Sequence, residues 1–282
     1  MADSVAIITD SSACIPQVLL GELGIHVVPI TVYIDAEVFL DGVDLEPSAV
    51  YRAVDEGLPV KSAAPSPLDY LDAIEGAGSG PVVLITPATE FTRMFHHALL
   101  AAELSGGPVT VVDSRSATAG HGLVVLAAAE ARRRGGALDD VVAAAEDAAA
   151  RAELVACLES LEYLRQSGHV PAMAVGLASH IGVRPVFRMR RGTAERLALP
   201  RSEQGALTRI AREWRAGGGP EATTSAVFHA ARPDRAERLR DLLGGASFVT
   251  EFSAAMGIHT GPGVAGVAWL REAPGEGTDQ GR

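Results

Sequence analysis

The sequence predicts an α/β protein with an N-terminal parallel α/β domain and a C-terminal mixed α/β domain. Short apolar runs at residues 5–8, 82–85 and 109–112 each lead directly into Ser, Thr or Asp. Runs of this length are typical of strands buried on both faces. Helix-like segments separate them, and that alternation predicts βαβ units and a parallel sheet. Right-handed crossovers align the strands, so we expect the polar ends to share one sheet edge, where such folds bind ligands.

The first half of the chain alternates these strands with helical patterns. A β-rich run over residues 25–34 leads into a short hairpin with turns at 35–36 and 41–42. Residues 61–67, Lys-Ser-Ala-Ala-Pro-Ser-Pro, are expected to form a loop because two prolines punctuate them. The helices expected in this half lie at residues 16–23, 46–56, 68–75, 91–104, 120–134 and 138–151.

The second half mixes hairpin-like strands with helices, which predicts a mixed sheet. We place the domain boundary near Ala152, giving domains at 1–152 and 153–271. Gly, Pro and charged residues dominate 272–282, so a disordered tail is expected there. The expected strands are 152–158, 183–188, 194–199, 223–229, 247–251 and 264–270, and the expected helices are 202–215 and 233–243.

Composition narrows the function classes. A net charge of -11 over 282 residues argues against a nucleic-acid partner, which requires a basic face. Cys14 and Cys157 lie far apart and suggest neither a disulfide scaffold nor a zinc site, as expected in a reducing cytoplasm. No secretory signal and no integral membrane segment are visible. No His, Cys and Asp cluster has metal-ligand spacing, so neither a metal nor another cofactor is expected.

Five stretches in the right order resemble one protein family. The first is Ile8-Thr9-Asp10-Ser11-Ser12, which resembles the opening of the DegV family of bacterial fatty-acid-binding proteins. The resemblance runs from Val5 to about Leu270. It implies a two-domain DegV-like fold, with an N-terminal three-layer α/β/α domain containing a parallel sheet and a C-terminal α/β domain containing a mixed sheet. It also implies a carrier that is not itself an enzyme. Such a carrier binds a long-chain fatty acid and presents it to a fatty acid kinase catalytic subunit, which forms an acyl phosphate.

Two loops carry the carboxylate-binding positions that the resemblance implies. Residues 61–67 resemble the family's Thr-Ser-x-Pro-Ser loop, whose ligand-binding threonine falls on Ser62 and keeps its hydroxyl. Ala63 stands where the family has serine. Residues 91–95, Phe-Thr-Arg-Met-Phe, lie over Leu-Ser-Gly-Thr-Tyr, so the ligand-binding serine falls on Thr92 and a glycine becomes Arg93. Without the resemblance, these segments would be interpreted as a plain loop and a helix cap.

The stretch His259-Thr260-Gly261-Pro262-Gly263 matches the family without change. Two glycines around a proline force a tight turn, which holds the preceding histidine in a fixed direction. A histidine donates a hydrogen bond to a carboxylate in either tautomer. Ser62, Thr92 and His259 are therefore expected to bind the carboxylate, with the acyl chain in an apolar tunnel.

The remaining matches are assigned to the pocket, its entrance or its supporting loops. Asp113-Ser114 is expected to shape a loop, and residues 161–169 with Arg184-Pro185-Val186 follow the family in outline, with Arg165 as the basic residue and His169 in place of an arginine. Arg201 matches a family arginine near the lipid entrance. The expected pocket or entrance residues are Asp10, Ser11, Arg93, Arg201, Thr260 and Gly261.

Two other functions stay open. A serine hydrolase acting on a lipid or ester would use Ser11 or Ser12 with His259 and Asp10, but no Gly-x-Ser-x-Gly elbow surrounds either serine. A nucleotide-binding domain is suggested only by the parallel sheet, because no Gly-x-x-x-x-Gly-Lys or Gly-x-Gly-x-x-Gly follows a strand.

Overall fold

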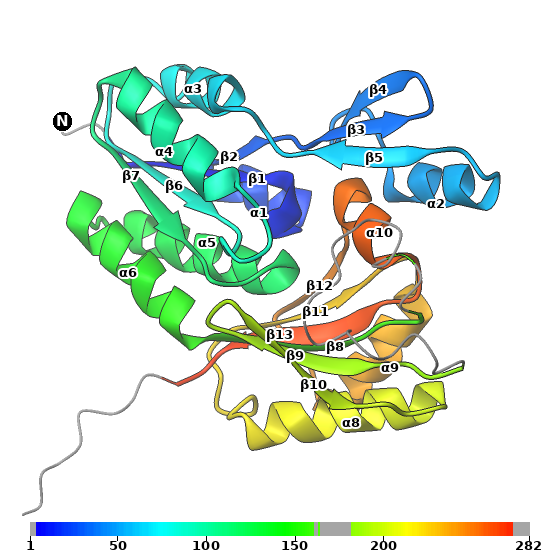
Figure 1. The fold of residues 1–282 in the computed structure, drawn as a ribbon. Helices are drawn as coiled ribbons and strands as arrows, with labels where there is room; N and C mark the ends of the chain where they lie inside the picture. The colour runs from blue at the N-terminus through cyan, green and yellow to red at the C-terminus, as the bar shows by residue number, and fades with distance from the viewer. Residues whose placement is uncertain (1–3, 161–162, 164–181, 273–282) are drawn as a thin grey trace, which may run out of the picture.

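The computed structural model describes residues 4–160, 163 and 182–272, and it confirms the predicted α/β class (Figure 1). A parallel sheet forms in the N-terminal part and a mixed sheet in the C-terminal part. Helix α5 (Thr118–Arg133) lies between the two sheets and contacts strands of both (Figure 1). Apart from Tyr163 and Glu272, the predicted motif at 161–169 and the predicted tail at 272–282 lie outside the described residues.

The N-terminal sheet has the strand order β2-β1-β6-β7, and all four strands run parallel. The two central strands, β1 and β6, are apolar and buried on both faces, as the continuous runs predicted, whereas the edge strands β2 and β7 are only partly buried. The strands are β1 (Ala6–Asp10), β2 (Ile25–Val28), β6 (Val82–Thr86) and β7 (Val109–Asp113).

Helices cover both faces of this sheet and complete three layers. Ile7 and Val83 face a core shared with α5, α6 (Leu138–Arg151) and α1 (Gln17–Glu22). Ile8 and Leu84, the next residues along the same strands, face a second core, shared with α3 (Pro67–Gly76) and α4 (Met94–Ser105). Alternation of side chains along each strand divides the apolar residues between the two cores.

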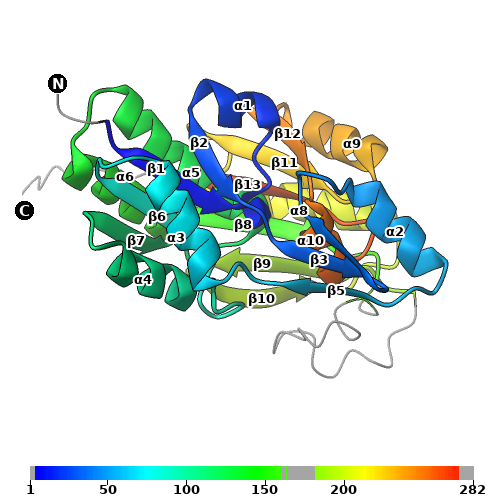
Figure 2. The same ribbon diagram turned by 90° about the horizontal axis from the view of Figure 1, so that it is seen from above.

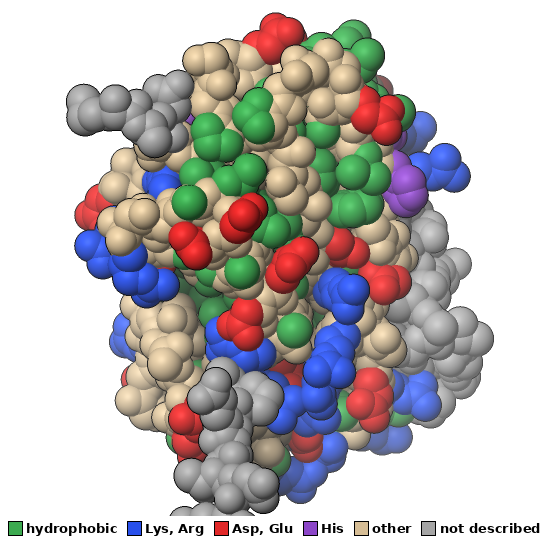
Figure 3. Space-filling view, turned by 90° about the vertical axis from the view of Figure 1, so that its left-hand side faces the viewer, with side chains coloured by type: hydrophobic (Ala, Val, Ile, Leu, Met, Phe, Trp, Pro, Cys, Tyr) green, Lys and Arg blue, Asp and Glu red, His purple; other side chains and the backbone are tan. Residues whose placement is uncertain are grey.

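The outer face of α4 is partly apolar. Leu99, Leu100 and Leu104 are exposed there. Figure 3 shows the corresponding face of the molecule, with hydrophobic side chains gathered in its upper half. The core therefore uses only part of the apolar surface of this helix.

A small antiparallel sheet extends the N-terminal part. Its strands β3 (Thr31–Ile34), β4 (Glu37–Leu40) and β5 (Val60–Ala63) have the order β4-β3-β5, and α2 (Pro47–Asp55) connects β4 to β5. The prediction of a loop from residue 61 was wrong at its start, because Ser62 lies in β5 opposite Val32. A short polar edge strand obtains its hydrogen bonds from a distant partner, so its own sequence carries little strand signal.

The C-terminal sheet has the order β10-β9-β8-β13-β11-β12, and only the β11–β12 pair is parallel. Helices α8 (Glu203–Ala216) and α9 (Pro233–Leu243) pack on one face, and α5 lies against the other. The strands are β8 (Ala152–Cys157), β9 (Val186–Arg190), β10 (Thr193–Ala198), β11 (Ser225–His229), β12 (Phe248–Glu251) and β13 (Ala265–Leu270).

Helix α10 (Ala254–Thr260) was not predicted from the sequence. It is short and contains Gly257, but its N-terminus is capped by the Ser253 hydroxyl, which accepts from Met256 N. Figures 1 and 2 both show α10 reaching from the C-terminal part to lie beside α2. Packing against α2 stabilises a helix that is too short to be stable alone.

The division into domains at 1–152 and 153–271 stays a prediction. Strand β8 begins at Ala152, where the expected boundary lies. However, one apolar core joins Val124 of α5 to Leu154 and Phe228 of the C-terminal sheet, and α10 crosses to the N-terminal part. Within the described segments, no helix is long and apolar enough to span a bilayer.

Candidate functional site

A cavity of about 540 Å³ lies between the N-terminal and C-terminal parts of the fold. Ligand pockets in proteins have volumes of roughly 300–1,000 Å³. The cavity walls are mainly apolar and include Phe91, Phe187, Met189 and Met256. Phe228 and Phe252 also line it, with their rings stacked at a centroid distance of 5.4 Å.

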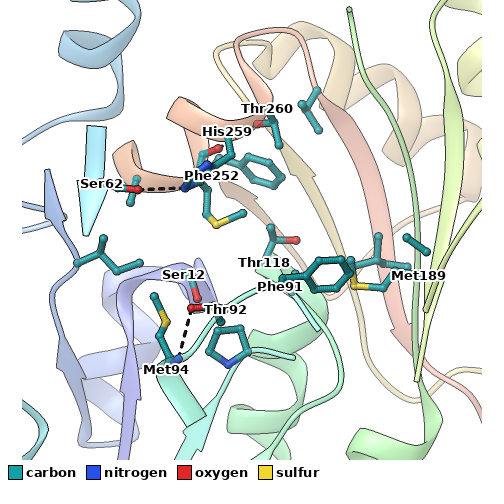
Figure 4. A pocket seen from close by; sticks show the side chains of 18 of the residues that line it. Ser12, Ser62, Phe91, Thr92, Met94, Thr118, Met189, Phe252, His259 and Thr260 are labelled. Carbon is teal, nitrogen blue, oxygen red and sulfur yellow. Dashed lines mark hydrogen bonds between the residues drawn. The ribbon is translucent and has the colours of Figure 1, made fainter. Parts of the chain in front are cut away.

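Polar side chains gather on part of this apolar surface. In Figure 4, Ser12, Ser62 and Thr92 lie toward one end of the cavity and Met189 toward the other. Such an arrangement suits a long apolar ligand with one polar end. The polar or charged lining residues are Ser12, Ser62, Thr92, Arg93, His97, Thr118, His259 and Thr260.

Ser62 and His259 approach the cavity from opposite parts of the chain. Ser62 lies in β5 and His259 in the last turn of α10, yet Ser62 Oγ and His259 Nε2 are 3.0 Å apart and hydrogen-bonded (Figure 4). Both side chains are half-buried. One proton lies in this bond, so when the Nε2 proton is donated to Ser62 Oγ, the Ser62 hydroxyl proton is the donor left for a carboxylate oxygen.

The turn after His259 requires its glycines. Gly261 has φ 71°, and a Cβ there would lie 2.2 Å from the Tyr163 ring. Gly263 has φ 95°, and a Cβ there would lie 2.7 Å from Glu159 Cβ. Both positions therefore combine a left-handed backbone with a close approach that excludes any larger residue.

A buried arginine supports this turn from behind. Arg235 of α9 is 0% exposed and donates to the Gly263 carbonyl. Its guanidinium also pairs with Glu159 at 2.8 Å and with Glu203 at 2.5 Å. The arginine thereby ties the carbonyl that follows the His259 turn to two carboxylates, and such charge-assisted bonds are stronger than neutral ones.

Thr92 and Arg93 line the cavity where α4 begins. The predicted helix from residue 91 was too long at its start, because α4 begins at Met94 and Arg93 is its N-cap residue. Thr92 Oγ1 accepts from Met94 N at 3.3 Å, so the hydroxyl caps the helix and keeps its own proton for another acceptor. Arg93 lines the cavity and is exposed, and no ion pair joins it to another described residue.

The other predicted pocket residues divide into two groups. Thr260 lines the cavity and donates its hydroxyl to Met256 O at 3.0 Å, whereas Gly261 does not line it. Arg201 is exposed and does not line the cavity. Asp10 and Ser11 do not line it either. Ser11 Oγ donates to Asp41 Oδ2 at 2.6 Å and accepts from Ile30 N at 3.1 Å, which anchors the loop after β1.

Comparison with known proteins places this architecture in a family. The sequence profile described as "uncharacterised protein, DegV family" matches residues 4–272. The chain belongs to the DegV family. A DegV domain-containing protein, SCO2569 of Streptomyces coelicolor, is 34% identical over 279 residues, covering 95% of this chain and 98% of that protein. The counterpart from Deinococcus radiodurans is 31% identical and covers 94% of this chain and 98% of its own length.

Solved DegV structures share the fold over nearly the whole chain. A DegV family protein from Thermus thermophilus, described by its fatty acid binding, superimposes with a TM-score of 0.88 at 26% identity, covering 96% of this chain and all of that one. DegV of Bacillus subtilis, described as a fatty acid binding protein, gives a TM-score of 0.84 at 22% identity, covering 95% of this chain and 99% of that one. The second likeness supports the fold alone.

Sequence reasoning missed three polar residues that line this DegV cavity, Ser12, His97 and Thr118. His97 lies one turn after Arg93 on α4, and its Nδ1 is 2.7 Å from the Pro65 carbonyl, which only accepts. Nδ1 therefore carries the proton. The i, i+4 spacing from Arg93 was a usable signal for His97. Ser12 was considered only as a nucleophile, since the turn that directs it into the cavity is not visible in the sequence.

Neither Ser11 nor Ser12, the nucleophiles that the hydrolase hypothesis names, contacts a base in the described part of the chain. Ser11 donates to Asp41 and Ser12 donates to Asp10, so both hydroxyls point at carboxylates. The imidazole that the hypothesis requires, His259, is hydrogen-bonded to Ser62 instead. A serine hydrolase needs its serine hydroxyl in contact with the base.

Proposed function

We propose that this protein binds a long-chain fatty acid in the cavity and presents its carboxylate to the catalytic subunit of a fatty acid kinase. The single observation that carries the proposal is the apolar cavity of about 540 Å³ with hydroxyls and an imidazole at one end. Membership of the DegV family and the fatty acid binding described for the Thermus thermophilus relative support it.

The apolar walls supply the affinity in this proposal. Burial is worth about 0.8 kcal/mol per methylene, or roughly 11 kcal/mol for the 14 methylenes of palmitate before association costs are subtracted. Ser62, Thr92 and His259 then set the direction of the ligand. Ser62 and His259 are half-buried and Arg93 is exposed, so a carboxylate held among them is within reach of a second protein.

The carrier role leaves the chemistry to the partner. The kinase subunit would transfer a phosphoryl group to the bound carboxylate, and this chain would hold the acyl chain and orient the head group. The buried free thiols of Cys14 and Cys157 suit a reducing cytoplasm, which is where we place the protein. We propose neither a nucleic-acid partner nor a cofactor, because the net charge is -11 and the site chemistry requires only the ligand.

The test is the lipid content of the freshly purified protein. Native mass spectrometry followed by gentle extraction should find a fatty acid from the expression host in stoichiometric amount. Adding a fatty acid kinase catalytic subunit and ATP should then yield acyl phosphate only when both proteins are present. Protein that retains no lipid and binds no added labelled fatty acid would refute the carrier role. Turnover of an ester substrate by the purified chain alone would favour the hydrolase.

A further inference from the structure

Ser12 lines the cavity, but its hydroxyl already donates a hydrogen bond to a buried carboxylate. The side chain is 3% exposed, and its Oγ donates to Asp10 Oδ1. Ser12 N donates to the same carboxylate oxygen at 3.0 Å. A serine hydroxyl has one proton, so it cannot donate to Asp10 and to a ligand carboxylate at the same time.

No cation compensates the Asp10 carboxylate within the described residues. Asp10 is 0% exposed, and its Oδ2 has no hydrogen-bond partner among them. His121 Nε2 of α5 is the nearest basic atom, at 3.9 Å. The Thr9 hydroxyl donates to Ile85 O at 3.0 Å and therefore accepts from His121 Nε2 at 2.9 Å. That contact fixes the proton on Nε2, and burial lowers the pKa of His121 to about 3, so the imidazole is neutral.

The other titratable groups that act on Asp10 are acids. Asp41, from the segment after β4, is a second carboxylate. Tyr70 of α3 and Cys14 interact with Asp10 and remain neutral, since burial raises the pKa of each. Burial of Asp10, aided by Asp41, raises its pKa to about 6. A ligand carboxylate at Ser12 would add another negative charge on the cavity side and favour the protonated form further.

We propose that Ser12 is an additional contact of the ligand head group and that Asp10 takes up one proton from solvent when an anionic head group binds. In the bound state, the protonated Asp10 donates to Ser12 Oγ, and the Ser12 hydroxyl proton turns toward the ligand carboxylate. Only hydrogen bonds and one solvent proton are exchanged. The assignment rests on the proposed function, because it names a contact and a linked proton of the same site.

Coupling between ligand binding and proton uptake by Asp10 can be measured. A carboxyl with a pKa of about 6 is about one-tenth protonated at pH 7, so binding should take up close to one proton there. The apparent Kd for an anionic ligand should then rise up to about tenfold per pH unit above pH 6. An uncharged ligand of the same length should show no such dependence, because it places no charge at Ser12.

Calorimetry on the delipidated full-length protein measures the proton directly. Palmitate is titrated at pH 7 in two buffers of different ionisation enthalpy, and hexadecanol serves as the uncharged probe. Wild type should take up close to one proton with palmitate and none with hexadecanol. Asp10→Asn and Ser12→Ala should both abolish the uptake. Ser62→Ala is the matched control, which should bind more weakly and still take up the proton.

Infrared difference spectra provide a second readout that needs no variant. Binding of carboxyl-¹³C palmitate to wild type should produce the carbonyl stretch of an unlabelled, protonated carboxylic acid in the protein. Absence of that band, or proton uptake by Asp10→Asn equal to that of wild type, would overturn the Asp10 assignment. Ser12→Ala with wild-type affinity and uptake would overturn the Ser12 contact. Failure of both palmitate and hexadecanol to bind would instead refute the proposed function.

Discussion

Removing the Ser62 hydroxyl should weaken binding of the carboxylate without disturbing the fold. Ser62 Oγ is 3.0 Å from His259 Nε2 at the polar end of the cavity, and both side chains are half-buried. The loss of one charge-assisted hydrogen bond costs about 1.5–3 kcal/mol. Partial exposure places Ser62→Ala in the lower half of that range, so palmitate Kd should rise about 10- to 40-fold.

A double-mutant cycle separates the coupling between Ser62 and His259 from the contribution of each residue to binding. Because Ser62 and His259 contact each other, Ser62→Ala and His259→Ala should together cost less than the sum of the two single losses. The burial energy of the acyl chain is unaffected, so the double variant should still bind fatty acid measurably.

Displacement of a fluorescent fatty acid, with thermal melts alongside, is the assay. Hexadecanol affinity should not fall in any of these variants, since it has no carboxylate. Ser48→Ala is a matched control, because Ser48 is an exposed serine whose hydroxyl accepts only from Arg52. Wild-type palmitate affinity in Ser62→Ala, or an equal loss for hexadecanol, would show that this pair does not hold the head group.

Three further outcomes are expected. Arg93→Gly should leave the palmitate Kd of the isolated protein unchanged and should slow transfer to the kinase. The reason is that Arg93 is exposed at the cavity and forms no ion pair with described residues. Weakened palmitate binding would instead identify Arg93 as a ligand contact. Gly261→Ala should lower the free energy of unfolding in urea by about 1–3 kcal/mol more than Gly135→Ala. Both glycines have a positive φ, but only a Cβ at Gly261 would clash with Tyr163. Equal losses in the two variants would contradict this reason. His121→Gln should gain stability over wild type by about 1.4 kcal/mol per pH unit as pH falls below 6.5 toward 3. The sign follows because the folded pKa of His121 is depressed, so wild type loses stability as its unfolded state binds the proton; a pH-independent difference would refute it.

Local patterns were sufficient for much of this protein. Short apolar runs that end in polar residues predicted the strands near residues 5, 82 and 109 and their parallel sheet. Strands of a parallel sheet are covered on both faces, so their sequences are continuously apolar and do not alternate with polar residues. The residues Ser62, Thr92, Arg93, His259 and Thr260 all line the cavity, and their positions were taken from the resemblance to the DegV family rather than from local patterns. A loop that holds a side chain in a fixed direction needs particular residues, such as the glycines after His259, and those residues can be identified in the sequence.

Tertiary structure decided which loop residues face the cavity and what surrounds them. After β1, the chain turns so that Ser12 lines the cavity while Asp10 and Ser11 do not, and that turn depends on Asp41 and Ile30 from distant segments. Arg201 likewise matched a motif, but it is exposed and does not line the cavity. Strand β5 and helix α10 are too short to be specified by their own sequences, and they form because β3 and α2 provide partners. Hydrogen bonds and burial between residues far apart in the sequence determine these features, so local sequence patterns do not predict them.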